Sequence, residues 1–158
     1  MFSQTVEYAL RVMTHLAVQE GPVTTRQIAV ATKVPEGYLA KVIQTLGRAG
    51  LVHSQRGLHG GSVLGRAAAD ITIFDIVNAI DPVQRIHTCP LGLKSHGVNL
   101  CPLHKRMDAA LDMVEQAFKD STLAELLAEP TRSRPLCDIE FAEATPSFTA
   151  KLTEVAKK

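Results

Sequence analysis

The 158-residue sequence lacks any apolar run that approaches the roughly 18 residues needed for a membrane-spanning helix. It also lacks the basic start and apolar core of a secretory signal, because Glu7 falls early in the opening MFSQTVEYALR. We therefore expect a cytoplasmic protein with no membrane partner. Apolar residues make up 46% of the chain, which indicates a globular protein rather than a disordered one.

Cysteine is scarce, and the number of cysteines is odd. Cys89, Cys101 and Cys137 are too few for a disulfide scaffold. In a reducing cytosol, clustered thiols more often bind a metal or carry redox chemistry. Neither a Cys-x-x-Cys motif nor a βαβ pattern supports a thiol redox enzyme, so we expect no enzymatic activity.

The net charge is only +1, but it is unevenly distributed along the chain. Residues 1–66 hold seven Lys and Arg against three Asp and Glu, whereas residues 67–158 hold ten against thirteen. A basic N-terminal half favours a polyanionic partner such as double-stranded DNA. The same asymmetry occurs in many enzymes, so the motifs must decide.

Three helices are predicted in the N-terminal half. Apolar spacing predicts a helix over residues 5–19. Thr24 and Gln27 form a capping box that begins a second helix, and a third is expected over residues 35–49, ended by Gly50. A tight turn followed by a polar, mildly basic helix indicates a helix-turn-helix. A plain helical bundle with a basic solvated face is the alternative.

A predicted hairpin follows directly. Residues 51–54 and 62–64 are typical of short strands around a glycine-rich turn, and a hairpin in this position is a wing. The turn lacks the Gly-Lys-Ser/Thr ending of a phosphate-binding loop, and no helix starts directly after it. Arg56 at its tip suits a phosphate or a narrow minor groove.

The second half is predicted to dimerise. Thr72 and Asp75 cap a helix that ends near residue 81, and a long helix is expected over residues 102–119. Its apolar stripe contains Leu103, Met107, Ala110, Leu111, Val114 and Phe118. Such a helix is a natural homodimer interface, because DNA half-sites reward two-fold symmetry; packing inside one monomer is the alternative.

The expected fold class is therefore mainly α with a small β-hairpin wing, a winged helix-turn-helix plus a long dimerisation helix. We divide the chain into a DNA-binding domain at 1–81, a cysteine loop at 82–101, a dimerisation region at 102–128 and a tail at 129–158. The dimerisation region includes a short helix that Ser121 and Thr122 open. We expect a partly ordered tail with a helix near residues 149–156.

Several short motifs in a fixed order carry a resemblance over roughly residues 1–128. They are Glu7-Tyr8-Ala9-Leu10-Arg11, Tyr38-Leu39, the run Leu46-Gly47-Arg48-Ala49-Gly50-Leu51-Val52, Arg56-Gly57 with Gly60-Gly61, and Ile71-Thr72-Ile73-Phe74-Asp75-Ile76-Val77. With these motifs the chain resembles the winged-helix regulators that include IscR, NsrR and CymR. The resemblance implies a homodimer that controls transcription, and several family members carry an iron–sulfur cluster as the sensor. The wing departs from the family because Ser62 follows Gly-Gly where an aromatic is common.

The same resemblance implies a set of metal ligands. Cluster-bearing members carry Cys-x5-Cys-x5-Cys; Cys89 and Cys101 match its outer two positions, and Ser95 stands in the middle. His104 matches a histidine three residues after the third cysteine. Glu7 falls where NsrR-like members have an acid that ligates the cluster from the partner subunit.

Two thiolates with two nitrogen or oxygen ligands suit a two-iron cluster better than a four-iron cluster. Regulation by thiols alone and a zinc site stay open as alternatives. His96 is a better substitute ligand than Ser95. On spacing alone, Glu7 pairs with Arg11 four residues later, and Cys137 is a small buried hydrophobe or an exposed thiol.

The expected function is a DNA-binding repressor switched by an iron–sulfur, redox or nitric-oxide signal at the loop of residues 89–104, which would move against the first helix. The third helix is expected in the major groove, reading bases through Tyr38, Lys41, Gln44 and Arg48. The start of the second helix is expected to touch phosphates through Thr25, Arg26 and Gln27. The wing is expected to contact backbone or minor groove through Arg56, His59, Gly60 and Gly61.

Overall fold

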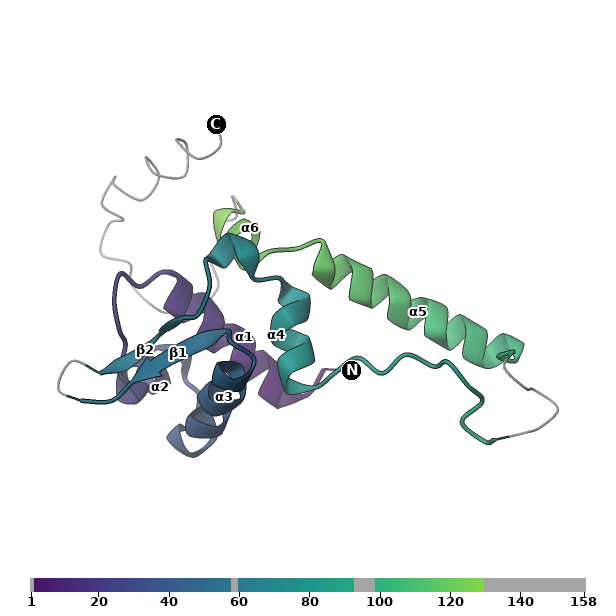
Figure 1. The fold of residues 1–158 in the computed structure, drawn as a ribbon, viewed down its shortest axis with the longest axis horizontal. Helices are drawn as coiled ribbons and strands as arrows, with labels where there is room; N and C mark the ends of the chain where they lie inside the picture. The colour runs from purple at the N-terminus through teal and green to yellow at the C-terminus, as the bar shows by residue number, and fades with distance from the viewer. Residues whose placement is uncertain (1, 58–59, 93–98, 130–158) are drawn as a thin grey trace.

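A computed structural model describes residues 2–57, 60–92 and 99–129. The elements in chain order are α1 (Gln4–Ala17), α2 (Thr25–Thr32), α3 (Glu36–Arg48), β1 (Val52–Gln55), β2 (Gly61–Leu64), the 3-10 helix η1 (Ala68–Asp70), α4 (Ile73–Ile80), α5 (Pro102–Lys119) and α6 (Leu123–Ala128) (Figure 1). The expected class, mainly α with one β-hairpin, is confirmed. The predictions for His59, Ser95, His96, Cys137 and the tail helix lie outside the described residues.

The winged head consists of α1 to α4, the hairpin and α6, gathered around a main apolar core with a second, small cluster of Val6, Ile73 and Val77 beside it. Its fully buried side chains come from every helix of the head, and they include Met13, Ile28, Leu39, Leu46, Ile76 and Leu123. The apolar stripe predicted for the first helix is the face of α1 that enters this core. Packing of these amphipathic faces, rather than helix propensity, stabilises the short helices of the head.

Local sequence signals set most helix ends. The Thr24–Gln27 and Thr72–Asp75 capping boxes are both present. Gly50 has a φ of +71°, and the next N–H donates back to the Leu46 carbonyl at 2.9 Å, so the predicted C-terminal cap of α3 is confirmed. Several predicted bounds were wrong by one or two residues: α1 covers 4–17 rather than 5–19, and α3 covers 36–48 rather than 35–49, with Pro35 as its N-cap. The two strands likewise differ from the predicted ranges by one residue.

The wing is fixed to the helix-turn-helix through its second strand. β1 and β2 pair antiparallel, and Ser62 also exchanges two backbone hydrogen bonds with Val23, of 2.8 and 3.0 Å. A Cβ at Gly61 would lie 2.8 Å from the Val23 backbone, so this close approach requires glycine. Ser62, where an aromatic was expected from the resemblance, is buried and shares a hydroxyl contact of 2.9 Å with Ser54.

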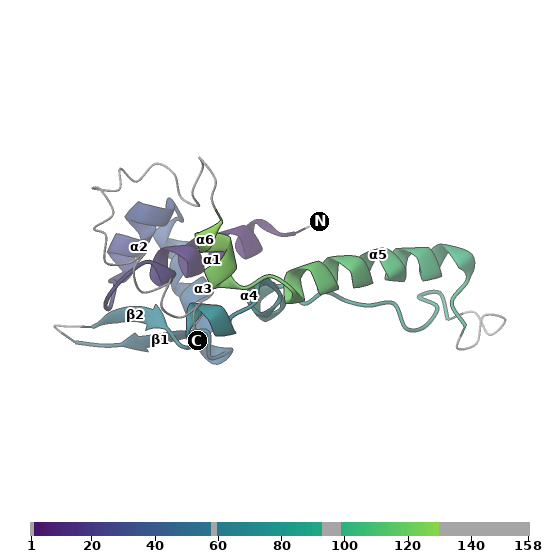
Figure 2. The same ribbon diagram turned by 90° about the horizontal axis from the view of Figure 1, so that it is seen from above.

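An arm extends from the head. We define the arm as α5 together with the connecting segment 81–92, which runs beside α5 in both views (Figures 1 and 2). After α5 the chain returns to the head, because Leu123 is fully buried in its core and donates its N–H to the Ile71 carbonyl at 2.8 Å. The core of the head therefore includes a residue from beyond the predicted boundary at 81. None of the helices in the described ranges combines the length and the hydropathy needed to cross a bilayer.

Candidate nucleic-acid interface and cysteine segment

The outer side of α3 is polar and exposed. Leu39, Val42 and Leu46 bury the inner side in the core. Because a helix repeats every 3.6 residues, the four side chains predicted to read bases fall on the solvent side, and all are exposed: Tyr38, Lys41, Gln44 and Arg48. Tyr38 is 60% exposed, so its ring and hydroxyl are accessible on this face.

A groove of about 620 Å³ separates α3 from the wing. Five of the predicted DNA-contacting residues line it: Thr25, Gln44, Arg56, Gly60 and Gly61. The groove therefore joins the first turn of α2, the middle of α3 and the backbone of the wing in one concave surface. Its donors and one guanidinium are suited to phosphates and base edges.

The groove also contains residues that the sequence analysis missed. Ala40 of α3 lines it, as do His53 and Gln55 of β1. The alternation of side chains along a strand could have indicated His53 and Gln55, because it places both on the same side of β1. Ala40 carries no polar group, so only the packing of α3 against the wing could reveal its position.

Other predicted contacts lie elsewhere on the head. Lys41 lines a separate hollow of about 200 Å³ with Ser3 and Asp81, between α3 and the ends of α1 and α4. Arg26 and Gln27 are exposed at the start of α2, but the Gln27 side-chain oxygen already accepts the Thr24 N–H at 2.9 Å. Gln27 thus has only its side-chain NH₂ to offer a phosphate.

Glu7 forms an ion pair with Arg11, as their spacing favours. Arg11 also donates to the Thr32 carbonyl at 3.4 Å, and its guanidinium lies 6.0 Å from the centre of the Tyr8 ring. The Tyr8 ring in turn meets the Tyr38 ring edge to face, at 6.2 Å between centroids. A continuous set of contacts therefore leads from Glu7 on α1 to the exposed face of α3.

The two described cysteines lie in the arm. Cys89 is 9% exposed, and Cys101 is the half-buried N-cap of α5. The Cys101 Sγ lies 3.3 Å from the His104 Nδ1, one helical turn into α5. Two thiols and an imidazole are suitable donors for a two-iron cluster or for zinc.

The described parts of one chain do not assemble a complete metal site. Within them, no group of three or more His, Cys, Asp and Glu side chains is arranged to hold a metal ion. Of the four predicted ligands, the structure shows a direct contact between Cys101 and His104, whereas Glu7 is paired with Arg11 of its own chain. The donor types fit a cluster, but further ligands must come from elsewhere, as the predicted ligand from the partner subunit would require.

Comparisons with known proteins agree with this architecture. The sequence pattern of the Rrf2 family, described as "Iron-dependent Transcriptional regulator", matches residues 2–129. The chain is 29% identical over 137 residues to the transcriptional regulator NsrR of Geobacillus kaustophilus (strain HTA426), covering 82% of this chain and 91% of that one.

Two solved structures have the same fold. T. potens IscR has a TM-score of 0.68 at 25% identity, covering 94% of this chain and 96% of its own. CymR, titled the global cysteine regulator of B. subtilis, has a TM-score of 0.67 at 27% identity, covering 81% and 96%. The predicted resemblance is confirmed: the chain belongs to the Rrf2 family and is a winged-helix, DNA-binding regulator of transcription.

Proposed function

We propose that this chain is a homodimeric repressor whose affinity for DNA is set by an iron–sulfur cluster at the Cys89–Cys101 segment. The observation that carries the proposal is the Cys101–His104 contact of 3.3 Å at the start of α5, with the buried Cys89 in the segment that runs beside the same helix. Bound there, a two-iron cluster would supply a centre that oxidants or nitric oxide can alter. The iron dependence in the description of the family supports the same choice.

Homodimerisation is proposed through the apolar side of α5. No residue of this 18-residue helix is buried. Its exposed apolar side chains include Leu103 at 63%, Met107 at 48% and Val114 at 37% exposure. These three lie on the side of the helix away from the carboxylates that face the connecting segment, so a second copy can cover them.

DNA is proposed to dock on the face of α3 and the wing. α3 would enter the major groove with Gln44 and Arg48 toward base edges, while Arg56 reaches backbone or minor groove. The contacts Glu7–Arg11, Arg11–Tyr8 and Tyr8–Tyr38 offer a route for the signal. If the partner subunit's cluster takes Glu7 as a ligand, Arg11 loses its ion pair and the aromatic contact with α3 is free to change.

A thiol-only switch is the second candidate. The Cys101–His104 contact favours it, because an adjacent imidazole can accept the proton of a reacting thiol. The relative titled a global cysteine regulator is consistent with sulfur-linked control of transcription in this fold.

The cluster is tested by spectroscopy of protein purified without oxygen, with iron and sulfide analysis. We expect visible absorption and about two iron and two sulfide per chain for a two-iron cluster. A colourless, iron-free protein after attempted reconstitution would reject the cluster and leave the thiol switch. Glu7→Ala is expected to shorten the lifetime of the cluster, whereas Glu20→Ala, at an exposed position just after α1, should not.

DNA docking is tested by binding to a promoter fragment over a range of salt concentrations. Arg56→Ala should weaken binding to all sequences and reduce the salt slope by about one, because one phosphate contact is lost. Gln44→Ala should cost about 1–3 kcal/mol and relax the sequence preference at one position. Lys105→Ala, on exposed α5, is the control; equal binding by wild type and Arg56→Ala would rule out the wing contact.

A further inference from the structure

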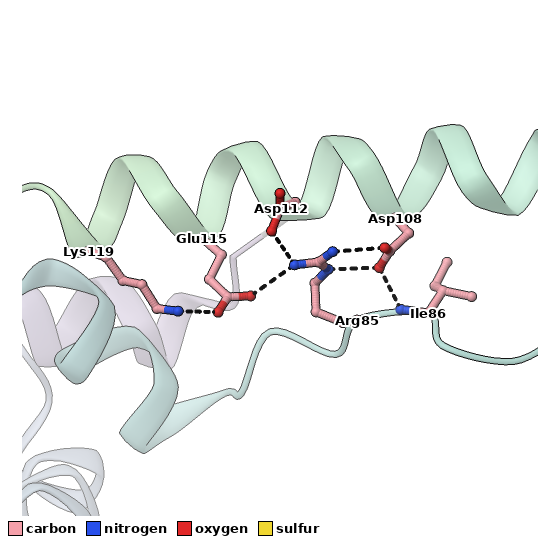
Figure 3. A network of polar contacts seen from close by, with 6 residues as sticks. All are labelled: Arg85, Ile86, Asp108, Asp112, Glu115 and Lys119. Atoms are coloured by element: carbon pink, nitrogen blue, oxygen red, sulfur yellow. Dashed lines mark hydrogen bonds and ion pairs between the residues drawn. The ribbon is translucent and has the colours of Figure 1, made fainter.

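Arg85 is bound to three carboxylates of α5 (Figure 3). Its Nε and Nη2 donate to the two oxygens of Asp108 at 2.7 and 2.8 Å, and its Nη1 donates to Asp112. The same Nη1 lies 3.6 Å from a Glu115 oxygen. The backbone N–H of Ile86 also donates to Asp108 at 2.8 Å, so the connecting segment is held by its main chain as well.

The geometry of this cluster, which we call the Arg85 clamp, is specific to arginine. A planar guanidinium can donate two parallel bonds to one carboxylate and a further bond to another, whereas a lysine ammonium is a single point charge. The side chains of Arg85 and Asp108 are only 24% and 18% exposed, so water competes weakly at the bidentate pair. The hydrogen bonds from Arg85, and then from the Ile86 N–H, lower the pKa of Asp108 to about 2.

The clamp closes the chain segment that contains both described cysteines. Arg85 lies four residues before Cys89, and Asp108 lies seven residues after Cys101. Without the clamp outside them, Cys89 and Cys101, which are 12 residue steps apart, could lie about 40 Å from each other. With Arg85 held on α5, the connecting segment runs beside the helix that Cys101 begins (Figure 1).

We propose that Arg85 is a positioning residue that holds the Cys89 side of the segment beside Cys101, and so sets the effective concentration of one thiol at the other. This inference rests on the proposed sensing function, because it assigns the clamp to that same pair of thiols. Arg85 itself need not touch any cofactor. It acts by holding the two ends of the cysteine segment together, so that less conformational entropy is lost when the two sulfurs meet at one centre or in one bond.

The clamp also explains why one side of α5 is left apolar and exposed. Asp108, Asp112 and Glu115 repeat at helical spacing and are all occupied by the connecting segment of the same chain. The opposite side, with Met107 and Val114, faces solvent. The polar side of α5 thus orders the cysteine segment, while its apolar side stays available to a second copy.

The test measures the proximity of the two thiols without any cofactor. In a Cys137→Ser background, Cys89 and Cys101 are equilibrated with glutathione: one oxidised glutathione takes two electrons and two protons and yields one protein disulfide and two reduced glutathiones. The equilibrium constant is an effective molarity for the thiol pair. We expect Arg85→Ala to lower it by about tenfold or more, toward the value for the same protein in denaturant, in which the loop is open.

Matched variants separate positioning from general stability. Asp108→Asn should lower the effective molarity nearly as much as Arg85→Ala does. The double variant should lower it no further, and Arg85→Lys should retain only part of the wild-type value. Lys119→Ala removes an ion pair of 2.6 Å to Glu115 without contacting the connecting segment, and it should leave the effective molarity unchanged. Circular dichroism checks that α5 stays helical, and Asp112→Asn gives a milder variant should Arg85→Ala fail to fold.

The outcomes distinguish the inference from the function on which it rests. Equal effective molarity in wild type and Arg85→Ala, or a wild-type value no higher than in denaturant, would overturn the role of Arg85. Failure of the wild-type protein to bind iron and sulfide would overturn the cluster alone, because the disulfide equilibrium needs neither. A cluster that forms equally fast and lasts equally long in wild type and Arg85→Ala would also count against the clamp.

Discussion

The winged head and the arm are held in place by different forces. In the head, apolar side chains from five α-helices and the hairpin are buried to near-zero exposure, among them Ile28, Leu39 and Ile76. In the arm, no residue of α5 is buried: Phe118 packs partly buried against a second, small apolar cluster of the head, and the Arg85 clamp ties the connecting segment to the helix. Apolar burial is non-directional and adds over many side chains, whereas the clamp depends on a few directional, charge-assisted hydrogen bonds whose electrostatic part salt can screen.

This difference suits a regulator. The exposed face of α3 needs a rigid support, because α3 must keep its orientation toward the wing. The proposed sensing segment needs the opposite property, since a signal with modest free energy can only move an element that is held modestly. The polar clamp also leaves the apolar side of α5 exposed, which is the side on which a second copy is proposed to bind.

Truncating one leucine in each region should separate them most clearly. Leu123→Ala removes a fully buried side chain that α6 brings into the head, and we expect a loss of about 2–5 kcal/mol in the free energy of unfolding. Leu91→Ala makes the same change in the arm, at 75% exposure, and should stay within about 0.5 kcal/mol of wild type. Urea denaturation followed by circular dichroism measures both free energies of unfolding. Similar losses of stability in the two variants would contradict the contrast between the buried head and the exposed arm.

A charge on the apolar side of α5 should act on assembly and not on the head. Val114→Asp would bury a carboxylate in the proposed homodimer interface, raising the dimer dissociation constant at least about tenfold, or about 1.4 kcal/mol. Gln116→Asp makes a similar change two positions along, about 200° around the helix, and should leave dissociation unchanged. Sedimentation equilibrium gives both constants. If Val114→Asp dimerised as tightly as wild type, another surface would have to form the interface.

The sequence was informative where structure depends on neighbours in the chain. The caps at Thr24 and Thr72 and the bounds of α5 followed from spacing of a few residues. The Arg85 clamp joins residues 23 apart, from a segment without helical or strand periodicity. No local pattern selects Asp108 as its partner, because that pairing requires the connecting segment to lie along α5.

The candidate site divides in the same way. The exposed face of α3 could be predicted because helical periodicity alone separates Gln44 and Arg48 from the buried Leu46. The groove could not, since it depends on the wing docking on Val23 through long-range hydrogen bonds. That Lys41 lines a hollow with Asp81 and not the groove likewise depends on where α4 ends against α3.

As the pH falls, the stability of the head should change before that of the arm. This change should be smaller than the effects of the leucine truncation and of the charge on α5. His15 in α1 is 6% exposed, its Nδ1 has no hydrogen-bond partner within the described part of the chain, and burial lowers its pKa below the ordinary 6.5. The unfolded chain therefore takes up a proton first, and the stability of the head should fall as the pH drops below about 6.5. His15→Leu should remove that slope from urea midpoints measured between about pH 7 and pH 5.

The arm should respond in a lower range of pH. The pKa of Asp108 is lowered from 3.8 to about 2, so the contribution of its pair with Arg85 is fully present above about pH 4 and is lost as the pH falls toward 2. The Arg85 Nε–H resonance reports the pair directly, since a hydrogen-bonded Nε–H exchanges slowly with water. A sharp Arg85 signal at pH 5, under conditions where the head is already less stable than at pH 7, would show that the two regions titrate separately. Loss of that signal above pH 5 would mean that the clamp depends on the protonation of the head, and the arm could not then be treated as an independently held element.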